Sequence, residues 1–417
     1  VLDVERGGAA AYLEGLQPGA HVLVEVVEVL VDAEVQHPHR HVVGTGQRAD
    51  AGLAGEEAKS LAWNYLAVGS QGVLGSVGDP REGRHLFLVG KDGKTRWAYS
   101  ADGTIGNNAI SMDQGLVYLI EQTSPERVAR AKRLGERLPA SWRLVALDVS
   151  TGEVAWKTEA GIAGRTELWS AQGVLVATGG RGMSGYEAST GRLLYNGNVS
   201  MARFPVIVGD TIYGEPAAYD LQTGKPVFRK DPFTSAESPW SFARSYGCGS
   251  VSAGPNLLLF RSGTLGMYDL AGDSGIHNFG GIRAGCHVNA VVAGGLVLMP
   301  PGDASCTCSY CFKTTIALVP TRKEESWSVF YNRLPTTPVR QVALNLGSPG
   351  DQRDGEGLLW LASPRPETPG RRQDIAIPFR FAGSEVYGAY RVNADNVQIA
   401  GADRPWVYTS GLKGPLR

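Results

Sequence analysis

The sequence predicts an all-β fold, a β-propeller of four-stranded blades, and three observations predict it. The first is composition: 55 Gly and 23 Pro are dispersed over 417 residues, as in a chain that turns often between short strands. The second is a repeated turn in which an aromatic residue follows a glycine by four positions. The third is the mean spacing of these turns, which is close to the roughly 40–45 residues of one four-stranded blade.

The repeated turn is expected to be the tight connection of a β-hairpin. Glycine supplies the positive φ of such a turn, and the Ser, Thr or Asp side chains before it can bond its backbone. The aromatic residue on the returning strand is then expected to pack between neighbouring sheets. Four turns follow the pattern, at residues 91–97, 150–156, 189–195 and 222–228, and they end on Trp97, Trp156, Tyr195 and Phe228.

Two looser copies of the turn follow. One has Gly275 and Phe279, and the other leads from Ile316 to Trp327. This gives about six clear units between residues 60 and 330, and a ring of about six to eight blades is expected.

The longest interval between two turns contains a predicted helix. Ser124 is a capping residue, Pro125 suits the first helical position, and a strongly charged run follows. We therefore expect a helical insertion at residues 124–138 on one face of the propeller.

Three segments are expected along the chain. Residues 1–55 match no recognised pattern and remain unassigned. Residues 56–335 form the propeller with its helical insertion. Residues 336–417 form a β-rich C-terminal segment, a partial β-sandwich that is incomplete if the chain stops at Arg417.

Several phrases resemble a known family. They lie at residues 146–156, 245–249, 259–264, 278–286 and 306–310. On these phrases the chain resembles the PQQ-like (quinoprotein alcohol dehydrogenase-like) repeat β-propellers, and specifically a group of multi-domain proteins from planctomycete-type bacteria. The resemblance implies about eight blades. Residues 342–351, 358–361 and 405–411 resemble the start of a malectin-like or galactose-binding-like sandwich.

Charge and hydropathy exclude two classes of partner. Lys and Arg (40) nearly balance Asp and Glu (41), so no basic field indicates nucleic acid. No run of about 18 apolar residues is present, so no membrane span is expected. Because the sequence starts at Val1, an export signal is expected to lie upstream, and a periplasmic or extracellular location follows.

All five cysteines lie in one stretch of the chain. In an exported protein such cysteines are expected to form disulfides, although their pairing cannot be read from the sequence. A zinc site on Cys306, Cys308 and Cys311 with Cys286 and His287 is an alternative, and unpaired core thiols are another. The phrases of the resembled group contain Cys248, Cys286, Cys306 and Cys308, which we assign to disulfides. Cys311 is then the candidate free thiol.

Arg244, Arg261 and Arg283 recur in the last units. They could converge on the central channel as an anion site, or bridge neighbouring blades.

Two functions remain in view. A PQQ-dependent alcohol or sugar dehydrogenase would need Ca²⁺ ligands, a catalytic Asp and an aromatic floor under the quinone. Many quinoprotein dehydrogenases also join two adjacent cysteines over the cofactor, and this sequence has no Cys-Cys pair. We therefore expect an exported, monomeric, non-catalytic propeller that binds a protein or a glycan and has no cofactor or metal. The alternative is a dehydrogenase that uses PQQ with Ca²⁺.

Overall fold

The computed structural model describes residues 62–413, except 80–81, 137–141, 161–165, 180–181, 200, 202–203, 287, 301–314, 321–325, 331–337, 366–387 and 394–395. The segment predicted as residues 1–55 therefore lies outside the described residues. The chain divides into two compact units. Unit 1 is Val1–Ser200 with Leu221–Gly224, and unit 2 is Met201–Asp220 with Lys225–Arg417.

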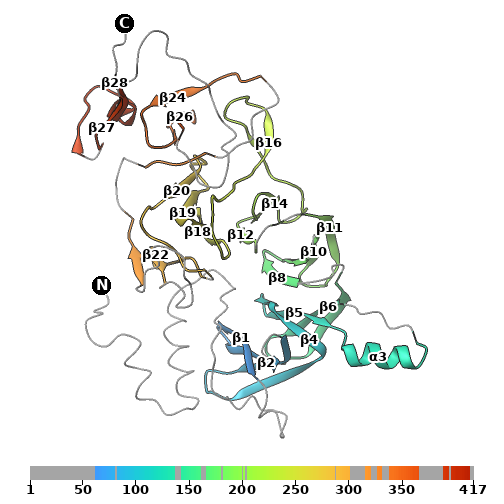
Figure 1. Ribbon diagram of the computed structural model, residues 1–417. Coiled ribbons are helices and arrows are strands. Elements are labelled where there is room, and N and C mark those ends of the chain that lie inside the picture. The colour runs from blue at the N-terminus through green and yellow to red at the C-terminus, as the bar shows by residue number, and fades with distance from the viewer. Residues whose placement is uncertain are drawn as a thin grey trace, which may run out of the picture. The chain divides into compact units, whose positions relative to one another are not determined.

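Unit 1 consists of antiparallel sheets in which each strand pairs with its neighbour in sequence (Figure 1). β4 is 19 residues long and belongs to two four-stranded groups, because its register breaks between Ile105 and Ile110. Its first part pairs with β3 and its second part with β5. The strands are β1 Ala62–Gly69, β2 Gly72–Asp79, β3 Glu82–Val89, β4 Thr95–Asp113, β5 Leu116–Gln122, β6 Trp142–Asp148, β7 Val154–Glu159, β8 Thr166–Ala171, β9 Val174–Gly179, β10 Gly182–Glu187 and β11 Leu193–Asn198.

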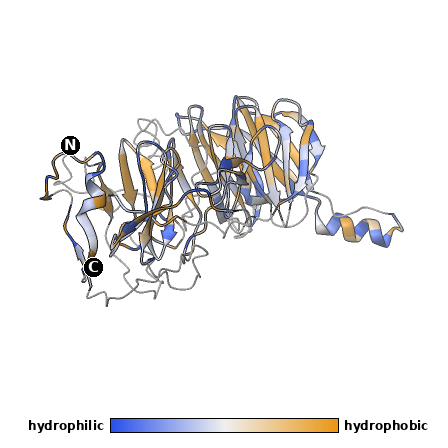
Figure 2. Ribbon diagram, turned by 90° about the horizontal axis from the view of Figure 1, so that it is seen from above, coloured by the Kyte–Doolittle hydropathy of each residue, from blue (hydrophilic) through white to orange (hydrophobic). Residues whose placement is uncertain are grey.

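The predicted insertion contains a helix, α3 (Pro125–Arg133), between β5 and β6. It begins at Ser124, whose Oγ accepts a hydrogen bond from the backbone N of Arg127 at 3.4 Å. Figures 1 and 2 show α3 projecting away from the sheet that carries it. Within the described part of the chain, no helix is long and apolar enough to cross a membrane.

Unit 2 repeats the same antiparallel pattern with shorter strands. β12, β13 and β14 form one sheet, β17 to β20 a second, and β21 to β23 a third, while β15 and β16 pair with each other. These strands are β12 Val206–Val208, β13 Thr211–Tyr213, β14 Ala218–Asp220, β15 Phe228–Lys230, β16 Glu237–Pro239, β17 Ser252–Gly254, β18 Leu257–Ser262, β19 Thr264–Asp269, β20 Ile276–Asn278, β21 Val291–Ala293, β22 Leu296–Met299 and β23 Ile316–Leu318.

The sheets of each unit pack face to face through apolar residues. In unit 1, Tyr118 and Leu144 of one sheet share a core with Leu168 and Tyr186 of the next. The first strands of successive sheets lie side by side: β4 contacts β8 in unit 1, and β17 contacts both β12 and β21 in unit 2. Among the described residues, the apolar ones are concentrated in the strands (Figure 2). Sheets that pack in this way, first strand beside first strand, are the blades of a β-propeller.

The predicted C-terminal segment continues from the propeller sheets within unit 2. Isolated bridges join Ile276 of β20 to Val329, and Ser328 to Asp351. β24 and β26 then run parallel, and β25 pairs with β26. The remaining elements are β24 Ala343–Leu346, β25 Gln352–Arg353, β26 Leu359–Ser363, β27 Gly388–Arg391, η3 Pro405–Thr409 and β28 Ser410–Lys413. The number of blades stays a prediction.

Candidate functional site

Three of the repeated aromatic residues dock on the turn that comes next along the chain. The indole Nε1 of Trp97 donates a hydrogen bond to the carbonyl oxygen of Val149 at 2.8 Å. Its ring covers Gly152, where a Cβ atom would come within 2.6 Å of it and where φ is +73°. The same two contacts join Trp156 to Ala188 (3.1 Å) and Gly191, and Tyr195 to Leu221 (3.0 Å) and Gly224. The repeat is therefore a packing device in these three turns.

Phe228 corrects this prediction for the fourth turn, because its side chain is 53% exposed. The strand that returns from this turn is short. The returning segment pairs with β14 only as far as Val227, whose backbone N donates to the carbonyl oxygen of Ala218 at 2.9 Å. β15 then pairs with β16 instead of β14. Phe228 is thus carried away from the position that Tyr195 takes in the preceding turn.

Phe279 and Trp327 also differ from the predicted pattern. Phe279 is 40% exposed, because β20 ends at Asn278 and the residue lies beyond the strand. The indole rings of Trp327 and of Trp406 in η3 are nearly perpendicular, with ring centroids 6.2 Å apart. Trp327 therefore packs against the C-terminal segment.

The turns on which the aromatic residues dock are called docking turns here, and each sheet also has a connection that enters its first strand. The docking turns join third to fourth strands, so in an antiparallel sheet they lie at the opposite end from these connections. In unit 2 the connections carry large exposed apolar side chains. Phe204 before β12 is 37% exposed, Tyr246 before β17 is 60% exposed and Val288 before β21 is 47% exposed. Tyr246 is the largest exposed ring among them and marks the candidate site.

The backbone around Tyr246 is fixed against the end of β18. The carbonyl oxygen of Tyr246 accepts a hydrogen bond from the backbone N of Gly263 at 2.5 Å. A Cβ atom at Gly247 would lie 2.3 Å from the carbonyl oxygen of Arg261, so only glycine allows this close approach. Tyr246 therefore presents its ring to solvent from an ordered loop.

Arg261 supports the ring of Tyr246 from inside the protein. It is 1% exposed, and its guanidinium carbon lies 5.4 Å from the ring centroid. Its Nη1 donates to the Sγ of Cys286 at 3.4 Å, and its backbone N donates to Oδ1 of Asn289 at 3.0 Å. Nδ2 of Asn289 in turn donates to the carbonyl oxygen of Gly285 at 2.6 Å. A cation–π contact of this kind contributes about 0.5–2 kcal/mol.

Arg244 fixes the other end of the Tyr246 loop. Its side chain is 2% exposed, and its Nε lies 2.8 Å from Oε2 of the buried Glu215. Its Nη1 donates to the carbonyl oxygen of Gly249 at 3.2 Å. Arg283 is also buried, at 1% exposure. All three predicted arginines thus lie inside the protein, Arg244 with a carboxylate partner, and the anion site stays a prediction.

The cysteines are only partly within the described residues. Cys248 is exposed and Cys286 is half-buried, and no disulfide joins the two. Cys306, Cys308 and Cys311 lie outside the described residues, so the disulfide assignment stays a prediction. Over the part of the chain that the structure describes, no group of three or more His, Cys, Asp or Glu side chains gathers as a metal site requires.

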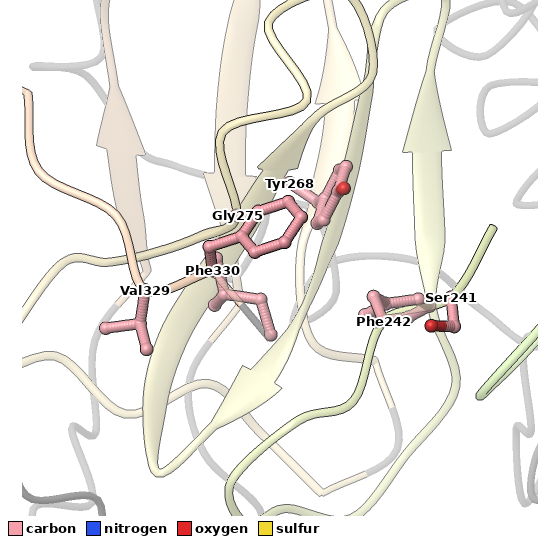
Figure 3. A pocket seen from close by; sticks show the side chains of 7 residues that line it. Ser241, Phe242, Tyr268, Gly275, Val329 and Phe330 are labelled. Atoms are coloured by element: carbon pink, nitrogen blue, oxygen red, sulfur yellow. The ribbon is translucent and has the colours of Figure 1, made fainter. Parts of the chain in front are cut away.

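A recess in unit 2 was a second candidate (Figure 3). It leaves no room for a water molecule, whereas small-molecule sites enclose roughly 300–1,000 Å³. Burial raises the pKa of Tyr268 in its wall, and Arg229 donates to the hydroxyl oxygen of Tyr268 at 2.8 Å. The recess is therefore part of the packed interior. Its lining residues are Ser241, Phe242, Tyr268, Gly275, Ile276, Val329 and Phe330.

Sequence reasoning did not single out Tyr246, Glu215 or Asn289. A signal existed for Tyr246, because it stands between Ser245 and Gly247 in a phrase that the family resemblance already marked. Glu215 and Asn289 gave none, since each meets its arginine only through the fold.

Comparison with known proteins supports the fold. No protein-family model matches the chain. The outer membrane protein assembly factor BamB of Burkholderia pseudomallei is 26% identical over 215 residues, which cover 41% of this chain and 56% of that protein. The chain thus spans little more than half the length of this curated relative.

Two solved structures are also similar in part. BamB from Moraxella catarrhalis has a TM-score of 0.38 and 14% identity, covering 62% of this chain and 69% of that one. A europium-containing methanol dehydrogenase has a TM-score of 0.24 and 10% identity, covering 57% of this chain and 38% of that one. The antiparallel sheets, the docked aromatic residues and the sequence match to BamB together show that this chain has a β-propeller fold.

Proposed function

We propose that this propeller is a non-catalytic scaffold that binds another protein through the surface around Tyr246. The observation that carries the proposal is an exposed tyrosine held on an ordered loop above a buried arginine. Tyrosine and arginine are enriched at the energetic centres of protein interfaces. A rigid aromatic ring also loses little conformational entropy when a partner covers it.

The sequence match to BamB supports the same proposal. That relative is named as an assembly factor for outer membrane proteins. By analogy, we propose that this chain also binds partner proteins and does so outside the cytoplasm. The five cysteines clustered between residues 248 and 311 fit an oxidising compartment. We further propose membership of the planctomycete-type multi-domain group, on the phrases at residues 245–249 and 278–286.

Site-specific photo-crosslinking in the native cell tests the contact surface. A photoreactive phenylalanine analogue replaces Tyr246 in one variant and Tyr408 in a control, because both tyrosines are 60% exposed. We expect discrete protein adducts from position 246 that are absent from position 408. In purified form, Tyr246→Ala should bind the adduct protein at least tenfold more weakly. Identical adducts at both positions, or none at 246, would contradict the proposal.

Two further measurements separate the rival functions. The purified protein with PQQ and Ca²⁺ should reduce no redox dye in the presence of alcohols or aldoses, and dye turnover would overturn the non-catalytic assignment. On a glycan array the protein should show no Tyr246-dependent binding. A glycan signal that Tyr246→Ala abolishes would replace the protein ligand by a carbohydrate.

A further inference from the structure

Helix α3 concentrates positive charge in a chain that is otherwise balanced. The chain as a whole carries a net charge of −1, yet the nine residues of α3 contain four cations and the single acid Glu126. The cations are Arg127, Arg130, Lys132 and Arg133. The helix is therefore the densest basic element in the described part of unit 1.

Three of the four cations of α3 lie on a different side from Val128, whereas Lys132 follows Val128 by four residues and shares its side. Ala131 is 5% exposed and Val128 is half-buried, so this side faces the protein. Arg127, Arg130 and Arg133 follow one another at intervals of three residues, which places them along one stripe. At 100° per residue this stripe lies roughly opposite Val128. It is exposed to solvent.

The first turn of α3 is anchored to the sheet by a chain of ion pairs. Arg127 pairs with Asp102 of β4. Asp102 also lies 2.7 Å from Nη2 of Arg143 in β6, which lies 2.9 Å from the fully buried Glu121 in β5. The helix therefore has a fixed origin, and its last turn projects away from this anchor (Figure 1).

The remaining cations of α3 lack this kind of neutralisation. Among the described residues, no carboxylate lies within ion-pair distance of Arg130, Lys132 or Arg133. Cations in a last turn stabilise a helix by about 0.3–1 kcal/mol each through its dipole. The helix dipole explains why these cations lie in the last turn. Their side chains can still form ion pairs with a second molecule.

We infer that the exposed basic stripe of α3 is a docking surface for an acidic segment of a partner protein. Charge complementarity indicates a polyanion, and guanidinium groups bind carboxylates through paired hydrogen bonds. A membrane surface fits less well, because helices that lie on membranes need a broad apolar face. Here Ala131 and Val128 face the protein, and Leu134, at 62% exposure, is the large apolar side chain left beside the stripe.

Binding of the full-length chain to a labelled twelve-residue polyglutamate peptide tests the inference. The test variant carries Arg130→Gln and Arg133→Gln, the two residues of the stripe that have no ion pair among the described residues. The control carries Lys91→Gln and Lys94→Gln, an equal loss of charge at exposed residues around the turn between β3 and β4. We expect the test variant to bind at least tenfold more weakly than the native chain and the control to stay within twofold. Affinity should also fall as salt is raised from 20 to 200 mM, since screening shortens the reach of these charges.

Two further measurements distinguish peptide binding by the stripe from a loss of folding and from binding to lipid. A variant with Arg130→Lys and Arg133→Lys keeps the charge and should bind within threefold of the native chain. Equal binding by test variant and control would overturn the inference. Anionic phosphatidylglycerol vesicles that bind more tightly than the peptide, with loss in the test variant, would overturn it in favour of lipid. The result is independent of Tyr246, so either proposal can fail alone.

Discussion

At the residue scale, the propeller depends on a contact between one aromatic ring and one glycine of the next turn. The position requires glycine for two reasons: its φ is positive, and the ring occupies the space that a side chain would need. The ring has two functions as well, since it fills the space between turns and donates a hydrogen bond to a turn carbonyl. A residue with a side chain at the glycine position would break both contacts at once.

A pair of glycine substitutions isolates the ring contact from backbone strain. At Gly191 (φ +73°) an added Cβ atom would lie 2.6 Å from the Trp156 ring, whereas at Gly173 (φ +76°) it would meet nothing within 4 Å. Both Gly→Ala changes incur the cost of positive φ. Only Gly191→Ala must also displace the indole, at about 1–3 kcal/mol. Urea unfolding should therefore show the larger loss for Gly191→Ala, and equal losses would argue against docking.

Particular residues show how far the sequence could predict the contacts of individual side chains. The pattern Gly-x-x-x-aromatic located Trp97, Trp156 and Tyr195, because turn and ring are set by local chemistry. Phe228 has the same local pattern and still lies exposed, because from Phe228 onward the strand pairs with β16 and no longer with β14. The exposure of Tyr246 likewise depends on Arg261, which only the fold brings beneath it.

At the element scale, α3 shows how an insertion is attached to a blade. Ser124 and Pro125 made the helix predictable, but its anchor joins residues of three separate strands. Hydrogen bonds from Arg127 and then Arg143 hold the pKa of Asp102 below its ordinary value, against the opposing effect of burial. The folded protein thus favours the charged carboxylate.

The anchor should weaken at acid pH. Because the pKa of Asp102 is lowered on folding, its stabilisation is complete above the ordinary value of 3.8 and is lost as pH falls through the lower folded value. Asp102→Asn should reduce the free energy of unfolding by about 1 kcal/mol at pH 7, and the difference should shrink towards pH 2. Hydrogen exchange of α3 should show the same trend.

Asp113 of β4 supplies the control for this pH dependence. Burial raises its pKa, so the folded protein disfavours its charge. Asp113→Asn should therefore cost no stability as pH rises from 3 to 7. A pH-independent effect of Asp102→Asn would contradict the role of the ion pairs.

At the scale of the whole molecule, the repeated turns specify the sheets. Two other kinds of connection take no part in this packing and are available for binding. The docking turns are committed to packing. The connections entering first strands, and the insertion that carries α3, are the parts where Tyr246 and the basic stripe face solvent. The sequence predicted the repeated sheets well, because the turn motif that specifies them recurs in several units. It predicted the binding surface poorly, because the residues around Tyr246 form no repeated motif.

Successive aromatic residues that dock on the next turn hold the sheets of unit 1 together, and a crystal structure of this chain would show whether they do. We expect the indole nitrogens of Trp97 and Trp156 within hydrogen-bond distance of the carbonyl oxygens of Val149 and Ala188, and the Tyr195 hydroxyl in the same relation to Leu221. All three rings should cover the glycine of the next turn. Rings in unrelated surroundings, or indoles open to solvent, would contradict the account.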